Sequence, residues 1–229
     1  MEHYHTLKIF VWLWRMAMKA KISKRKPNMN NARKSPFRKE KERFLIVCEG
    51  KETEINYFNS LINLFQINRI VSATHFKQNP SKIAEFSTIK LNDGYDKIYC
   101  VFDKDKHGDF GKALNIIKQN EDLQAIISNP CFEYWILLHF EKTTKPFGSG
   151  SKSPCDELVS KNLKNYIQDY SKNYDKFENI IQNYLQTALL NAKEIDIENK
   201  KDKNKNLSFT DIWILVNKLE EIKEKYGKR

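Results

Sequence analysis

The segment FLIVCEG, residues 44–50, marks a change from a basic leader to a pattern typical of a folded sheet. A run of five apolar residues, bounded by charge before it and by glycine after it, predicts a short strand that is buried on both faces. A carboxylate at the rim of such a strand is costly unless a cation or a hydrogen-bond donor faces it. We therefore interpret Glu49 as part of a functional site at the carboxyl end of this strand.

The residues that follow alternate between strand and helix patterns. Apolar or alternating runs predict further strands at 71–78, 96–105 and 123–130. Helical spacing predicts helices over 53–67, 80–92, 108–120 and 130–142, the last with Asn129 as its N-cap and Pro130 at its first position. Four strands, each followed by a helix, predict an α/β fold with a mainly parallel sheet of about four strands flanked by helices.

The same patterns predict the domain organisation. We expect an α/β core over residues 44–142 and a helical C-terminal region over 143–229 that packs on this core. Helices of that region are predicted at 156–170, 176–195 and 208–226. Residues 1–43 are expected to form a flexible basic arm in front of the first strand.

Almost all of the net charge of +11 belongs to this arm. Residues 1–43 hold 13 of the 40 Lys and Arg residues against three Glu, so the rest of the chain is nearly neutral. Such an arm can contact phosphates without reading a base sequence. The net charge therefore does not predict a basic surface on the folded part.

An apolar stretch lies inside the arm at residues 7–20, where Lys8 and Arg15 interrupt it. It is shorter than the roughly 20 apolar residues of a membrane-spanning helix, and no small-residue cleavage site of a signal peptide follows it. A helix on a membrane surface stays open, as does translation from Met18 or Met29. We expect a cytoplasmic protein without a transmembrane segment.

The four cysteines are Cys48, Cys100, Cys131 and Cys155, and no two of them form the C-x-x-C of a zinc ribbon or a redox motif. Cys48 and Cys100 lie within apolar runs. We expect small buried thiols in a reducing compartment, because a chain of 229 residues can bury a core without disulfides.

Two carboxylates end the third predicted strand: Asp103 and Asp105 in the motif DKDKH. Residues two apart on an extended chain point to the same side, and Glu49 reaches the same point if the first and third strands are neighbours. Three close carboxylates repel one another unless a cation lies among them, and oxygen ligands suit Mg²⁺ or Mn²⁺. The alternative is a solvated turn, with Glu49 paired to Lys51 or Lys104.

Three motifs resemble the RloB (AbiLii-like) proteins of bacteria, which carry a Toprim-type fold. They are VCEGKETEINYF (47–58), VFDKDKHGDF (101–110) and ISNPCFEYWILLHFE (127–141), and the closing NLSFTDIWILVNKL (206–219) also fits. The resemblance runs from about residue 44 to residue 222, and its most specific part is the SNPCFEYWILLHFE block.

The resemblance implies a Toprim-like site in which Glu49, Asp103 and Asp105 serve Mg²⁺-dependent cleavage or transfer of nucleic-acid strands. It also implies phage defence by abortive infection, together with an AAA-type ATPase partner. The family usually reads E-G-E-K-T-E, whereas this chain reads E-G-K-E-T-E from Glu49 onward. The exchange means that neither Lys51 nor Glu52 is assigned a fixed role.

Further candidates lie near the same rim. Asn129 and Glu133 stand where the fourth strand meets its helix, and Glu133 is either another carboxylate of the site or a residue that favours the helix N-terminus. His107 is either a proton donor or phosphate contact, or an ordinary surface histidine. His139 is expected in the core, with a supporting role behind the site as the alternative.

These observations predict a nuclease that depends on Mg²⁺ or Mn²⁺ and hydrolyses RNA, such as tRNA, or DNA. Glu49, Asp103 and Asp105 are its predicted metal ligands, and Glu133 and His107 complete the predicted catalytic set. One alternative is a non-catalytic scaffold that binds the ATPase and nucleic acid. Another is a nucleotide-binding or primase-like activity. The sequence leaves assembly into a homo-oligomer open.

Overall fold

The computed structural model describes residues 41–104, 108–148, 151–201 and 207–227. The strands are β1 Phe44–Cys48, β2 Val71–His75, β3 Lys97–Asp103, β4 Leu123–Asn129 and β5 Phe209–Thr210. The helices are α2 Thr53–Leu64, α3 Pro80–Leu91, α4 Phe110–Lys118, α5 Glu133–Leu137, α6 Pro154–Lys161, the 3₁₀ turn η1 Leu163–Asn165, α7 Phe177–Lys201 and α8 Ile212–Tyr226. The predicted α/β class is confirmed.

All strands belong to one sheet in the order β2-β1-β3-β4-β5. The pairs β1–β2, β1–β3 and β3–β4 are parallel, so the carboxyl ends of these strands meet at one edge. The short strand β5 runs antiparallel to β4, so the sheet has five strands rather than about four. A two-residue strand carries no recognisable period, and β5 is defined only by its pairing with a strand far away in the sequence.

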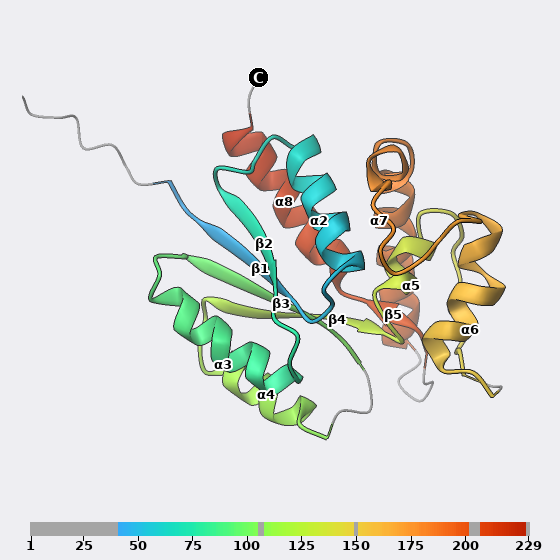
Figure 1. The fold of residues 1–229 in the computed structure, drawn as a ribbon, viewed down its shortest axis with the longest axis horizontal. Helices are drawn as coiled ribbons and strands as arrows, with labels where there is room; N and C mark the ends of the chain where they lie inside the picture. The colour runs from blue at the N-terminus through green and yellow to red at the C-terminus, as the bar shows by residue number, and fades with distance from the viewer. Residues whose placement is uncertain (1–40, 105–107, 149–150, 202–206, 228–229) are drawn as a thin grey trace, which may run out of the picture. The chain divides into compact units, whose positions relative to one another are not determined.

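The sheet separates two apolar layers, which Figure 1 shows as helices α2 and α8 on one face and α3 and α4 on the other. Successive side chains of β1 alternate between these layers, with Ile46 in the first and Val47 in the second. Both side chains are fully buried. This explains why the strand reads as a continuous apolar run rather than as an alternating one.

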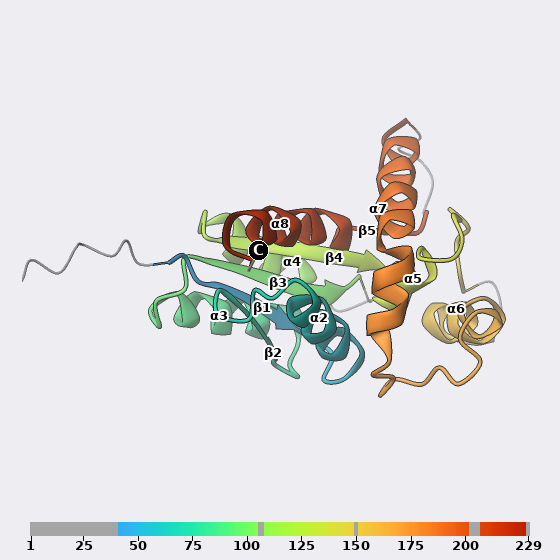
Figure 2. The same cartoon turned by 90° about the horizontal axis from the view of Figure 1, so that it is seen from above.

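Helices α5, α6 and α7 lie beyond the carboxyl ends of the strands, as Figures 1 and 2 both show. The long helix α7 packs against α2, α5 and α8. The predicted helical C-terminal region is therefore present and forms part of the surroundings of the carboxyl edge.

Two helices are much shorter than predicted, and α7 continues past the predicted end at residue 195 to Lys201. The helix expected over 130–142 is confined to α5, because the N–H of Tyr134 donates to the carbonyl of Cys131, three residues earlier, in a turn tighter than an α-helix. Asn129 is therefore not its N-cap, and its side-chain amide donates to the Leu207 carbonyl at 2.9 Å instead. The helix expected over 156–170 ends at Lys161 and is followed by the turn η1.

In the part of the chain that the structure describes, no helix is both long enough and apolar enough to cross a membrane. Residues 1–40 lie outside the described ranges, so the flexible arm stays a prediction.

Candidate functional site

A cavity of about 530 Å³ opens at the carboxyl edge of the sheet. Its walls come from the loop after β1, the end of β3, the turn after β4 and the start of α6. Six carboxylates line it: Glu49, Glu52, Glu54, Asp103, Glu133 and Asp156. Parallel α/β sheets bind their ligands in this position, beyond the carboxyl ends of the strands.

Two of these carboxylates come from neighbouring strands. β1 and β3 pair with Cys48 opposite Val101, and the Glu49 N–H continues the ladder by donating to the Val101 carbonyl at 3.0 Å. The chain bends directly after β1, while Asp103 is the last residue of β3. The predicted adjacency of the first and third strands is confirmed, and it brings Glu49 and Asp103 to one cavity.

Glu54 lies in the first turn of α2 and is buried against the loop after β1. The Gly50 N–H donates to Glu54 Oε1 at 3.2 Å. A Cβ atom at position 50 would overlap the same carboxylate, so a larger residue there would force the Glu54 side chain to move. Burial raises the pKa of Glu54 to about 7, and the negative charges of Glu133 and Glu49 add to the rise, although backbone N–H groups oppose it.

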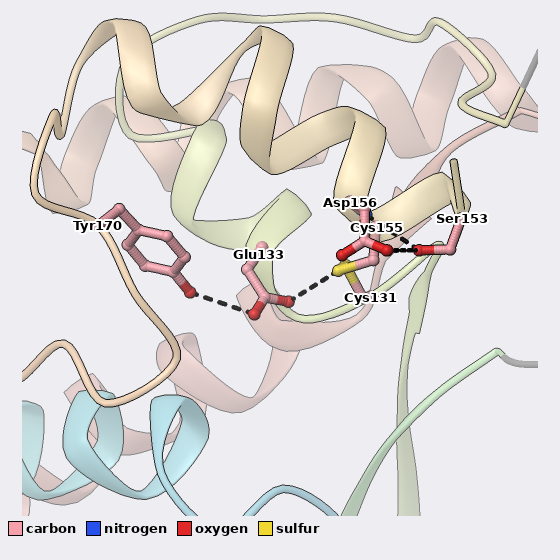
Figure 3. The surroundings of a disulfide bond; sticks show 6 residues. All are labelled: Cys131, Glu133, Ser153, Cys155, Asp156 and Tyr170. Atoms are coloured by element: carbon pink, nitrogen blue, oxygen red, sulfur yellow. Dashed lines mark hydrogen bonds between the residues drawn. A yellow bond between two sulfur atoms is a disulfide. The ribbon is translucent and has the colours of Figure 1, made fainter. Parts of the chain in front are cut away.

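Glu133 is the first residue of α5 and is only 5% exposed. Tyr170 donates its hydroxyl hydrogen to Glu133 Oε1 at 3.1 Å, while Oε2 lies 3.2 Å from Cys155 Sγ (Figure 3). Burial raises the pKa of Glu133, and the positive charge of Lys172 and the hydrogen bond from Tyr170 oppose the rise. The two oxygens of this carboxylate therefore face different partners.

Lysine side chains add positive charge to the cavity. Lys51, Lys77 and Lys172 belong to its walls, and all three are exposed. The backbone of Lys172 is tied to α2, because the Thr53 hydroxyl donates to the Lys172 carbonyl at 2.7 Å. An anionic ligand such as a phosphodiester would meet these ammonium groups next to the carboxylates.

A disulfide bond joins Cys131, in the turn after β4, to Cys155, in the first turn of α6 (Figure 3). The expectation of free thiols is wrong for this pair. Cys48 and Cys100 are free and buried, as expected. The pairing could not be predicted from the sequence, because the two cysteines are 24 residues apart. They meet only because the chain returns after α5 and packs α6 beside the turn that follows β4.

The side chains whose ligand atoms lie close enough to share one cation are not the three that the sequence predicted. Within the described ranges, Cys131, Glu133 and Cys155 form the one group of three or more His, Cys, Asp or Glu side chains whose ligand atoms lie within 4.8 Å of one another. Glu49 and Asp103 line the same cavity, but the third predicted ligand, Asp105, lies outside the described residues.

Comparison with known families agrees with these features. The family described as RloB-like protein matches residues 44–219, well over half of the chain. The chain belongs to the RloB-like family. The matched range of this RloB-like protein begins at the first residue of β1 and ends within α8, so it covers every wall of the cavity. No curated protein and no solved structure matches the chain.

His139 lies in the aromatic core of this RloB-like protein and is not among the residues that line the cavity. Its Nδ1–H donates to the Trp135 carbonyl at 3.1 Å, and Nε2 lies 3.2 Å from the Tyr57 hydroxyl, which can donate to it. Burial lowers the pKa of His139 to about 4, so the ring is neutral near pH 7.

Other predicted site residues are placed as follows. Asn129 ends β4 and bonds to Leu207, which fixes the segment that leads into β5. Its side chain is not part of the cavity wall. His107 lies outside the described residues, as Asp105 does.

Glu54 is the residue of this site that the sequence interpretation did not single out, although a signal for it exists. Phe58 and Leu61 follow it by four and seven residues, so all three fall on one face of α2. An acidic residue on the apolar face of a helix, just after the rim of a parallel strand, indicates a buried carboxylate. In the RloB-like chain that carboxylate completes the cavity wall.

Proposed function

We propose that this RloB-like protein is a Toprim-type, metal-dependent nuclease that hydrolyses phosphodiester bonds in RNA, such as tRNA, or in DNA. The observation that carries the proposal is the arrival of Glu49 and Asp103, from adjacent parallel strands, at one cavity with lysines in its walls. Family membership supports it, because the resemblance to RloB proteins rests in part on the motifs that contain these two residues.

Glu49, Asp103 and Asp105 would hold Mg²⁺ or Mn²⁺. The fit rests on the chemistry of the donors: carboxylate oxygens from neighbouring strands, with the further carboxylates of Glu54 and Glu133 in the same walls, suit a hard divalent cation. A bound ion of this kind lowers the pKa of water and offsets the negative charge of a phosphodiester under attack.

The side chains of the cavity have separate tasks in this proposal. Lys51, Lys77 and Lys172 bind the phosphate backbone of the substrate. Glu54 is buried and accepts the N–H of Gly50 at Oε1, and in this proposal its Oε2 carries the proton that is transferred. Gly50 keeps that carboxylate in position.

The cellular role and the partner are proposed from the family resemblance alone. The protein acts in the cytoplasm, in abortive-infection defence against phage, alongside an AAA-type ATPase. Nucleic acid is the substrate, and the ATPase is the partner that controls access to it or release of the nuclease.

The test uses purified protein with cellular RNA and with DNA, in Mg²⁺ or Mn²⁺. We expect fragments with wild type, and none with a chelator or with Glu49→Gln or Asp103→Asn, each shown to be folded by circular dichroism. The matched control is Glu42→Gln, because Glu42 lies at the opposite edge of the sheet and bonds to Lys225. No cleavage with either metal, combined with stable binding to the ATPase, would instead support the scaffold.

A further inference from the structure

The Cys131–Cys155 disulfide is not isolated from the cavity, because both cysteines belong to its wall together with Glu133. Cys131 is buried and Cys155 is partly exposed, so a reductant or an ion in the cavity can reach the pair. The cysteines come from two elements, the turn after β4 and the helix α6. In the disulfide form, the two sulfurs and one carboxylate oxygen of Glu133 lie within 4.8 Å of one another, and reduction would free both sulfurs as ligands.

The carboxylate is already aimed at the sulfur pair. Tyr170 holds Glu133 Oε1 at 3.1 Å, which leaves Oε2 at 3.2 Å from Cys155 Sγ (Figure 3). A sulfur in a disulfide carries no proton to donate to Oε2, whereas the reduced thiol does. An outer residue that orients a carboxylate in this way is typical of built metal sites.

The local backbone also suits thiolate ligands. Cys155 follows Pro154 in the first turn of α6, where the helix dipole favours negative charge. The cap of α6 does not depend on the cysteines, because the Asp156 N–H donates to Ser153 Oγ at 3.2 Å and the Ser153 hydroxyl donates to Asp156 Oδ2 at 2.6 Å. The Cα atoms of Cys131 and Cys155 are 5.9 Å apart. Two sulfurs on one tetrahedral zinc ion lie about 3.8 Å apart, given a Zn–S distance of about 2.3 Å, which rotation of the two side chains can reach.

We propose that, in the reduced protein, Cys131, Glu133 and Cys155 bind a thiophilic divalent cation such as Zn²⁺, and that cation binding and disulfide formation exclude each other. A dithiol or phosphine reductant supplies two electrons to the S–S bond, and two protons complete the thiols. Binding of the ion displaces both thiol protons to solvent. A two-electron oxidant such as hydrogen peroxide re-forms the S–S bond, becomes two hydroxide ions and releases the cation.

The site differs in kind from the carboxylate site of the nuclease proposal and does not depend on it. Glu49 and Asp103 offer oxygen to a hard cation, whereas the cysteine pair selects a softer one. The same cavity would then hold two cation sites of different chemistry, one of them available only when Cys131 and Cys155 are reduced.

Cobalt titration tests the inference directly. Reduced full-length protein, freed of excess reductant without oxygen, is titrated with Co²⁺ and then with Zn²⁺. We expect a thiolate-to-cobalt charge-transfer band that saturates at one ion per chain, is removed by Zn²⁺, and is absent before reduction. Absence of the band in the reduced wild type would overturn the proposal.

Two variants test whether the cobalt band comes from Cys131 and Cys155 and not from other side chains. Cys131→Ser with Cys155→Ser should lose the band, although Cys48 and Cys100 remain as thiols; a band that persists would overturn the assignment. Asp103→Asn should keep the band, which separates this result from any failure of the nuclease proposal.

A matched tyrosine pair tests the role of Tyr170. Tyr170→Phe should weaken cobalt binding about tenfold, because the oriented carboxylate is lost. The control is Tyr166→Phe, which removes a similar bond of 2.9 Å to Glu141 outside the cavity and should leave the affinity unchanged. Equal affinities for both variants would contradict the orienting role, and no band in the reduced wild type would contradict the site itself.

Discussion

The two ends of the strands carry cavities of similar size whose acidic side chains have different surroundings. The cavity at the carboxyl ends measures about 530 Å³, and the one near the amino ends, between the sheet and α8, about 680 Å³. Glu54 in the first is buried and has a pKa raised to about 7. Glu42 in the second is exposed, and hydrogen bonds from Lys225 and Tyr226 lower its pKa.

The two cavities are distinguished by the surroundings of their charges and not by their volume. The larger cavity has paired, solvated charges that need no further partner. The smaller one gathers six carboxylates, of which Glu54 and Glu133 are buried, and such a group is stabilised by a cation or by protons.

The largest expected effect is on catalysis at the carboxyl end. Glu49→Gln and Asp103→Asn should each lower the cleavage rate by about 100-fold, the upper end of the range for a lost outer-shell contact, because each removes a ligand itself. Initial rates on an RNA or DNA substrate in Mg²⁺ measure the effect. Glu42→Gln should keep the wild-type rate, and an equal loss in that variant would break the contrast between the two ends.

Reduction of the Cys131–Cys155 disulfide should lower the free energy of unfolding by about 3.5 kcal/mol, because the unfolded chain regains the freedom of a closed loop of roughly 25 residues. Urea unfolding with and without a phosphine reductant, in the presence of chelator, measures the difference. A Cys131→Ser, Cys155→Ser variant should show no response to the reductant. A similar response in that variant would assign the effect to other thiols.

Glu54 should make the apo protein less stable as the pH rises. Its pKa is raised from 4.5 to about 7 on folding, so the folded state holds the proton more tightly than the unfolded state. The contribution of Glu54 to stability is therefore fully present below about pH 4.5 and falls by roughly 3 kcal/mol as the pH rises through 7. Glu54→Gln should lack this part of the pH dependence in urea unfolding with chelator. Identical profiles for the two proteins would mean that Glu54 is solvated.

The smallest effect is expected at the amino end. The lowered pKa of Glu42 gives a contribution that is present above its unfolded pKa of 4.5 and is lost as the pH falls through the folded value. Glu42→Gln should change the melting temperature only slightly above pH 5, and high salt should remove the difference, because the pair with Lys225 is exposed. A fall in melting temperature that is the same at low and high salt would contradict the view that Glu42 and Lys225 form a solvated, weak ion pair.

The sequence was sufficient to predict the strands of the parallel sheet, because β1, β3 and β4 carry apolar runs with clear ends. It also located Glu49 and Asp103 at the carboxyl edge, because predicting their position requires only the ends of the two strands and the knowledge that these strands are neighbours. The strand β5 could not be predicted, because its pairing with β4 is a long-range contact without a local pattern.

Three features of the site depend on tertiary structure. The raised pKa of Glu54 depends on its burial and on the charge of Glu133, and neither follows from helical spacing alone. The Cys131–Cys155 pair depends on how the chain returns after α5. The helix around Trp135 ends early because three-residue turns flank it, and no residue pattern distinguishes those from α-helix.

The central claim is that carboxylates from adjacent strands form a divalent-cation site at the carboxyl edge, and binding of Mn²⁺ measured by electron paramagnetic resonance tests it most directly. The account predicts that wild-type protein removes the signal of free Mn²⁺ and that Mg²⁺ restores it, whereas Glu49→Gln and Asp103→Asn leave the signal unchanged. Equal uptake of Mn²⁺ by wild type and by both folded variants would contradict the account.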